Sequence, residues 1–152
     1  MKRIVILLLV VLCAGYQPIF AQKSAPTDNY RYYKALELIE ENGFVPEAQQ
    51  LLIDNISYNP KHILSYLPLI SSYREERKFN DALQLVNTAI ALNHKNSEVS
   101  DAKLLWWKAC IYDDFGRVDE SIYLMEQAVK KGKKIKEKGL EDFQKALAQM
   151  YY

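Results

Sequence analysis

Hydrophobic residues recur along this chain at the three- and four-residue spacing of a helix, and the pattern returns after 34 residues. The matching pairs are Tyr32 and Tyr66, Ala48 and Ala82, Leu51 and Leu85, and Asn59 and Asn93. A third copy follows with five extra residues, because Gly43 and Gly116 are 73 residues apart. A fixed period of this length indicates stacked units that each bury their hydrophobic face against a neighbour.

The spacing predicts a pair of helices in each unit and no strand. The expected helices lie at about 30–42, 46–57, 65–76, 80–92, from Ser97 or Ser100 to Phe115, and at about 119–131. We expect Ser65 and Asn80 to cap the starts of the third and fourth helices. Gly132 is expected to end the sixth helix.

A last helix is expected at about 137–150. Its apolar stripe consists of Leu140, Phe143, Ala146, Leu147 and Met150. A stack of about three units needs an end cap with a polar outer face, and this helix fits that role.

The middle unit carries the fullest set of repeated residues: Tyr66, Leu69, Ile70, Tyr73, Phe79, Ala82, Val86, Ala89 and Ile90. This set resembles the tetratricopeptide repeat, a family built from helix pairs. The resemblance covers residues 29–135. It implies an all-α fold, a right-handed α-solenoid of about three antiparallel helix-pair repeats at 29–62, 63–96 and 102–135, closed by the capping helix.

Some positions depart from the family pattern. Leu36 and Ile70 stand where a small residue is usual. Arg77 replaces the glycine between the two helices of unit two, and Asn55 replaces an alanine that unit two has as Ala89. We therefore expect looser or shifted packing in units one and two.

Residues 1–21 have the parts of a secretory signal: a basic start, an apolar run, and Ala21 before the expected cleavage site. A retained anchor is less favoured, because the run is shorter than the ~20 residues that cross a bilayer. Lipidation at Cys13 is also less favoured, because Leu12 is larger than the residue that normally precedes a lipidated cysteine. Residues 22–29 are a polar linker, and the repeat domain is expected at 29–152. We expect an exported, periplasmic protein.

Removal of Lys2 and Arg3 with the signal changes the net charge from +1 to −1. A near-neutral chain has no general attraction to nucleic acid. The one charged run consists of Lys130, Lys131, Lys133, Lys134, Lys136 and Lys138. Lysines suit a helix C-terminus because they offset its dipole. The run could also contact anionic lipid or an acidic partner, but short charge runs are usually solvated, and membrane contact is not expected.

The resemblance implies that a partner binds in a concave groove lined by the first helix of each pair. The expected contact residues are Tyr30, Tyr33, Glu37, Leu64, Leu67, Arg74, Lys103, Trp106 and Asp113. This set combines apolar and acidic side chains, which suits a peptide with apolar anchors and basic character. Trp106 has an alternative role in packing, because either it or the adjacent Trp107 must face a neighbouring helix.

Catalysis finds little support in the sequence. His62 and His94 lie at or beside predicted turns and lack the three or four ligands of a zinc site. A nucleophile made of Cys110 and His94 would lack a third, orienting group. There is no glycine-rich phosphate loop. We therefore expect no enzyme activity, metal or cofactor, and we interpret Cys110 as a small, partly buried apolar residue.

These features predict a non-catalytic scaffold or adaptor in a bacterial cell envelope, with a protein or peptide partner in the concave groove. The alternative is a self-associating structural subunit of an envelope complex, because short stacks often complete their core by dimerising. A small-molecule or glycan binder ranks last, because three units form an open curve rather than a closed pocket.

Overall fold

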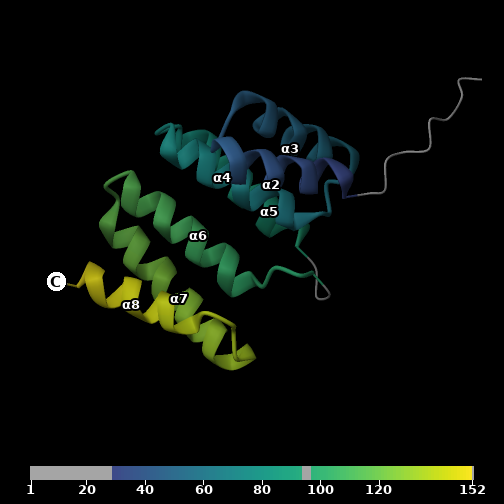
Figure 1. The fold of residues 1–152 in the computed structure, drawn as a ribbon. Coiled ribbons are helices and arrows are strands. Elements are labelled where there is room, and N and C mark those ends of the chain that lie inside the picture. Colours follow the sequence, from purple (N-terminus) through teal and green to yellow (C-terminus); the bar gives the residue numbers. More distant parts are fainter. Residues whose placement is uncertain (1–28, 94–96, 152) are drawn as a thin grey trace, which may run out of the picture.

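The computed structural model describes residues 29–93 and 97–151, and every regular element within them is a helix (Figure 1). The elements are α2 (Tyr30–Asn42), α3 (Pro46–Tyr58), the 3₁₀ helix η1 (Ile63–Ser65), α4 (Tyr66–Glu75), α5 (Phe79–Leu92), α6 (Asp101–Asp114), α7 (Val118–Ile135) and α8 (Leu140–Met150). The all-α prediction is confirmed for these residues. The expected signal segment, most of the linker and His94 lie outside them.

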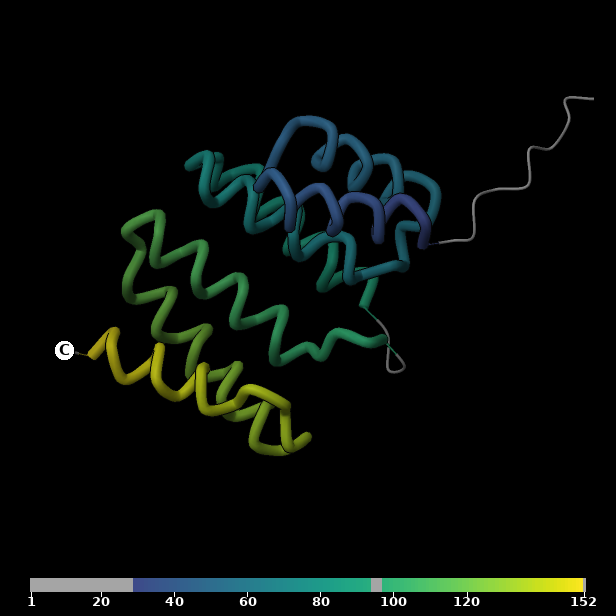
Figure 2. The backbone as a smooth tube through the Cα atoms, in the orientation of Figure 1, coloured from purple at the N-terminus to yellow at the C-terminus, as the bar shows by residue number. Residues whose placement is uncertain are grey.

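Each α-helix packs on its immediate neighbours in the chain, and the most extensive contacts are within the pairs α2–α3, α4–α5 and α6–α7. Figure 2 shows the path, in which α6 lies between the α2–α5 part and the α7–α8 part. The buried residues form three successive clusters: one joins α2, α3 and α4, one joins η1, α4, α5 and α6, and one joins α6, α7 and α8. The hydrophobic core is therefore distributed along the chain.

The repeated small residues lie where paired helices come close. Ala48, Ala82 and Ser121 are all fully buried. The Ser121 hydroxyl donates a hydrogen bond to the backbone carbonyl of Ala109 at 2.7 Å, which ties α7 to α6. A serine replaces alanine here without leaving a buried polar group unpaired.

Most helix ends match the expected positions. Ser100 caps α6, because its Oγ accepts a hydrogen bond from the Lys103 backbone N–H at 3.0 Å. The prediction that Asn80 caps a helix is wrong, because α5 already begins at Phe79. Arg77, which replaces the usual glycine, has a left-handed φ of 58°. The turn geometry is therefore kept without glycine, at some cost in backbone energy.

The prediction that Gly132 ends a helix is wrong. Helix α7 continues to Ile135, and the left-handed residue is Lys136, with φ 54°. Gly132 is buried, and a Cβ atom built on it would lie 2.8 Å from the Leu140 side chain. Gly132 therefore lets α8 approach α7 closely instead of breaking the helix.

Asn55 does not loosen the packing at its position. Its side chain is 2% exposed and donates from Nδ2 to Ser65 Oγ at 2.8 Å. Ser65 Oγ also lies 2.7 Å from His62 Nδ1. Since Asn55 is already the donor to this oxygen, the hydroxyl is best assigned as the donor to a neutral His62. The polar residues therefore join α3 to η1.

This network predicts that the free energy of unfolding falls as the pH drops below about 6.5. Burial lowers the pKa of His62, although Glu98 acts in the opposite direction. The folded protein thus favours neutral His62, while the unfolded chain takes up a proton at the ordinary pKa. The stabilisation is complete above the unfolded pKa and is lost as the pH falls through the folded pKa. Urea denaturation between about pH 7.5 and 5 measures this slope.

The His62→Asn variant is the control for that measurement, because it keeps a hydrogen-bond acceptor near Nδ1 and removes the titrating ring. Its pH slope should be shallower than that of the wild type. An equal slope in both proteins would assign the titration to another group.

Candidate functional site

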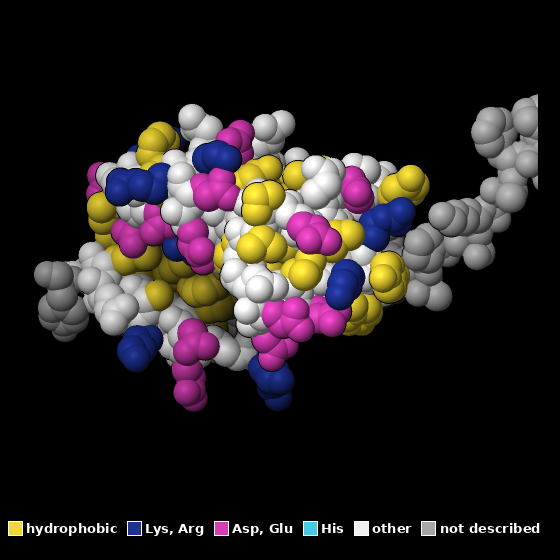
Figure 3. All heavy atoms as spheres, turned by 45° about the horizontal axis from the view of Figure 1, so that its top comes forward, with side chains coloured by type: hydrophobic (Ala, Val, Ile, Leu, Met, Phe, Trp, Pro, Cys, Tyr) yellow, Lys and Arg dark blue, Asp and Glu magenta, His cyan; other side chains and the backbone are white. Residues whose placement is uncertain are grey.

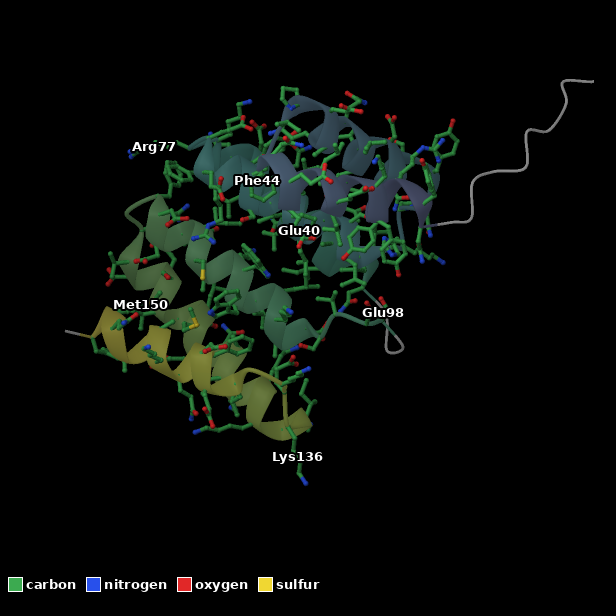
Figure 4. All side chains as sticks on the ribbon, viewed as in Figure 1. Glu40, Phe44, Arg77, Glu98, Lys136 and Met150 are labelled. Atoms are coloured by element: carbon green, nitrogen blue, oxygen red, sulfur yellow. The ribbon has the colours of Figure 1, made fainter. Side chains whose placement is uncertain are left out.

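Helix α2 presents a stripe of exposed side chains. Tyr30 is 55% exposed and Tyr33 is 63% exposed, and Glu37 and Glu40 continue the stripe at helical spacing. Figure 4 shows Glu40 projecting from α2 on the side that faces α6. Lys34 Nζ lies 2.9 Å from Glu37 Oε2, an exposed contact that neutralises little of the local charge in water. This stripe is available to a partner.

Helix α4 contributes little apolar surface to this face. Leu67 is only 9% exposed and belongs to the central core cluster, against which Leu64 also packs. The prediction that Leu67 is an exposed contact residue is therefore wrong. Its side chain packs between α4 and the neighbouring helices of this cluster.

Trp106 also lies in a packed environment. Its ring stacks on Phe143 of α8, with 5.5 Å between ring centroids and 14° between ring planes. Trp107 meets Trp106 edge-on at 5.3 Å and packs against the central core cluster. The indole nitrogens of both tryptophans are buried without a hydrogen-bond partner in the described residues. Of the two roles left open for Trp106, the structure supports packing.

An ion pair joins the C-terminal ends of α4 and α6. Arg74 Nε lies 2.5 Å from Asp114 Oδ2, and its guanidinium lies over the Trp107 ring at 5.5 Å. The sequence placed Arg74 and Asp113 in one groove but did not identify Asp114 as the ion-pair partner. Arg74 and Asp114 are 40 residues apart, which is close to the longer repeat step of the third unit. This spacing places them at nearly equivalent positions of neighbouring units and could have indicated the pair. Asp114 is thus paired with Arg74, whereas Glu40 and Asp113 are exposed and form no salt bridge among the described residues.

The two remaining expected contact residues, Lys103 and Asp113, lie at opposite ends of α6. Lys103 is exposed in its first turn and Asp113 is exposed in its last turn. Beside the Asp113 end is a hollow of about 500 Å³, lined by Ser71, Arg74, Glu75, Arg77, Phe79 and Asp114. The space-filling view shows a recess toward the C-terminal side of the molecule, with hydrophobic side chains at its floor and acidic side chains around it (Figure 3).

Cys110 is poorly suited to nucleophilic chemistry. Burial raises the pKa of its thiol to about 11, although Arg74 acts in the opposite direction. The thiol is therefore protonated near neutral pH, and the protonated form is a weak nucleophile.

The described residues contain no group of three or more His, Cys, Asp or Glu side chains placed to hold a metal ion. None of their helices has the length and apolar character needed to cross a bilayer.

No protein-family model matches this chain, and a search of curated proteins found no match. The described residues define an all-α protein with an acidic, partly apolar face along α2, α4 and α6. The tetratricopeptide resemblance stays a prediction from the sequence.

Proposed function

We propose that this chain is an exported, non-catalytic adaptor with a tetratricopeptide-like solenoid of about three helix pairs, capped by α8. Three features support the solenoid: the 34-residue period, the full burial of the equivalent small residues, and the packing of each α-helix on the next. The expected signal at residues 1–21 supports export to a bacterial periplasm.

We propose that the adaptor binds a partner segment along the face of α2, α4 and α6. The observation that carries this proposal is the α2 stripe, in which two exposed tyrosines precede two exposed glutamates. Tyrosine supplies a large contact area at low entropic cost, and exposed carboxylates select basic partners. The contact set proposed here is Tyr30, Tyr33, Glu37, Glu40 and Asp113. The partner is a protein or peptide segment with apolar and basic side chains.

The alternative function is a self-associating structural subunit. The outer face of α8 is unsuited to that role, because it exposes polar residues: Glu141, Asp142, Gln144, Lys145 and Gln149. Such a face is typical of a solvated end cap. Self-association would therefore have to use another face.

A pull-down from envelope extract tests the proposal. The bait is residues 22–152, because this segment retains all the helices of Figure 1 and omits the expected signal. The Tyr33→Ala/Glu40→Lys variant removes one aromatic contact and reverses one charge. We expect it to weaken binding of the captured partner at least about tenfold, because central aromatic and charged contacts dominate interface energies. Affinity is measured with the purified partner after its identification.

The matched control is Tyr123→Ala/Glu126→Lys on α7, because Tyr123 is also 63% exposed. Circular dichroism checks that both variants are folded. If both variants bind equally well, the α2 face is not the site. If the bait captures nothing and elutes as a dimer, the self-associating subunit becomes the better explanation.

A further inference from the structure

A second charged surface lies at the end of α7, away from the α2 face. Helix α7 has 18 residues, against 14 for α5 and α6, and its last turn leads into a left-handed turn at Lys136. We call residues 130–138 the lysine tip. All six of its lysines are exposed, and Lys136 extends outward from the turn before α8 (Figure 4).

The tip contains six lysines and one acidic residue, Glu137, so its net charge is strongly positive. Lys131 Nζ lies 3.3 Å from Asp101 Oδ2, but among the described residues the other five form no salt bridge. The helix dipole accounts for lysines in the last turn of α7. It does not account for Lys136 and Lys138, which follow the end of the helix at Ile135.

An exposed apolar side chain lies among these charges. Ile135 is 54% exposed, and its chain neighbours are Lys134 and Lys136. Gly132 holds α8 against the preceding turn, so the backbone that presents Ile135 is anchored. A single apolar residue surrounded by lysines suits a boundary where anionic groups lie beside hydrocarbon.

We propose that the lysine tip binds the surface of an anionic lipid bilayer. The lysine ammonium groups attract lipid phosphates, and Ile135 enters the boundary between headgroups and acyl chains. The tip contains no arginine for bidentate recognition of a carboxylate. The exposed ring of Tyr123 lines a hollow with Lys130, Lys131 and Lys134, and tyrosine is common where a protein meets a membrane surface. Binding therefore depends on charge density and on the apolar surface of Ile135, and this combination favours a bilayer over an acidic protein or a nucleic acid.

Vesicle sedimentation tests this proposal with the chain from Gln22 to the end. One set of vesicles is phosphatidylcholine, and the other contains about 30% phosphatidylglycerol. The wild type should sediment only with the anionic vesicles, and salt should release it. Each lysine near an anionic surface changes the partition coefficient about fivefold. The K133Q/K134Q/K136Q/K138Q variant should therefore bind at least about a hundredfold less, and I135S should bind about threefold less.

The charge-matched control is K34Q/K61Q/K78Q/K145Q, which makes the same change in net charge. These four lysines lie outside the tip, and each is exposed or half-buried. This control should bind far more tightly than the tip variant. Equal binding to both kinds of vesicle overturns the proposal, as does equal loss in the control and the tip variant. Salt-sensitive binding to polyglutamate without any vesicle sedimentation also overturns it, in favour of an acidic protein partner.

Discussion

Phe143→Ala is expected to lower the free energy of unfolding by about 3–5 kcal/mol and to loosen α8 from the rest of the protein. Phe143 is 4% exposed and stacks on Trp106. It is the one buried residue of α8. Removing its ring therefore leaves a cavity and exposes the indole of Trp106.

Urea denaturation followed by tryptophan fluorescence measures both effects. The native emission should shift to longer wavelength in the variant, because the Trp106 ring gains contact with water. Lys145→Ala is the control on the same helix. Lys145 is exposed, so its loss should change stability by no more than about 0.5 kcal/mol. Unchanged emission and stability in the Phe143 variant would mean that α8 does not cap the fold.

Asn55→Ala is expected to destabilise the protein by about 2–3 kcal/mol, although the repeat pattern favours alanine at this position. Asn55 is 2% exposed and donates to Ser65 Oγ. Alanine would remove this donor, leave the Ser65 and His62 pair poorly satisfied, and open a small cavity. The change in urea midpoint gives the measurement.

A double-mutant cycle with Ser65→Ala separates the network from simple loss of volume. If the two side chains act together, the double variant loses less stability than the two single variants combined. A neutral or stabilising effect of Asn55→Ala would show that the family pattern outweighs this buried network.

The helices were predictable because they depend on local signals. The hydrophobic spacing located α2 and α3 to within a residue, and Gly43 marked the end of α2. The small and large repeated positions also identified buried residues such as Ala48, Ala82 and Val86. These features follow from the period of one helix and from the contact between two consecutive helices, and both depend on residues that are close in the sequence.

Other features depend on contacts that local patterns do not encode. Gly132 has the sequence signal of a helix end, but its contact with Leu140 makes it a packing residue. Trp106 stands at a groove position in its own helix, yet α8 supplies a ring that stacks on it. The face that an end helix covers cannot be deduced from the period of the helices before it.

The neighbour-to-neighbour packing has a consequence for how the chain acquires its structure. Because each α-helix makes its main contacts with its immediate neighbours in the chain, few contacts require distant segments to meet first. Proteins of this kind fold quickly, and structure can begin in one unit and spread to the next. A chain that emerges N-terminus first during synthesis or export would thus form the α2–α3 pair before α7 and α8 have emerged.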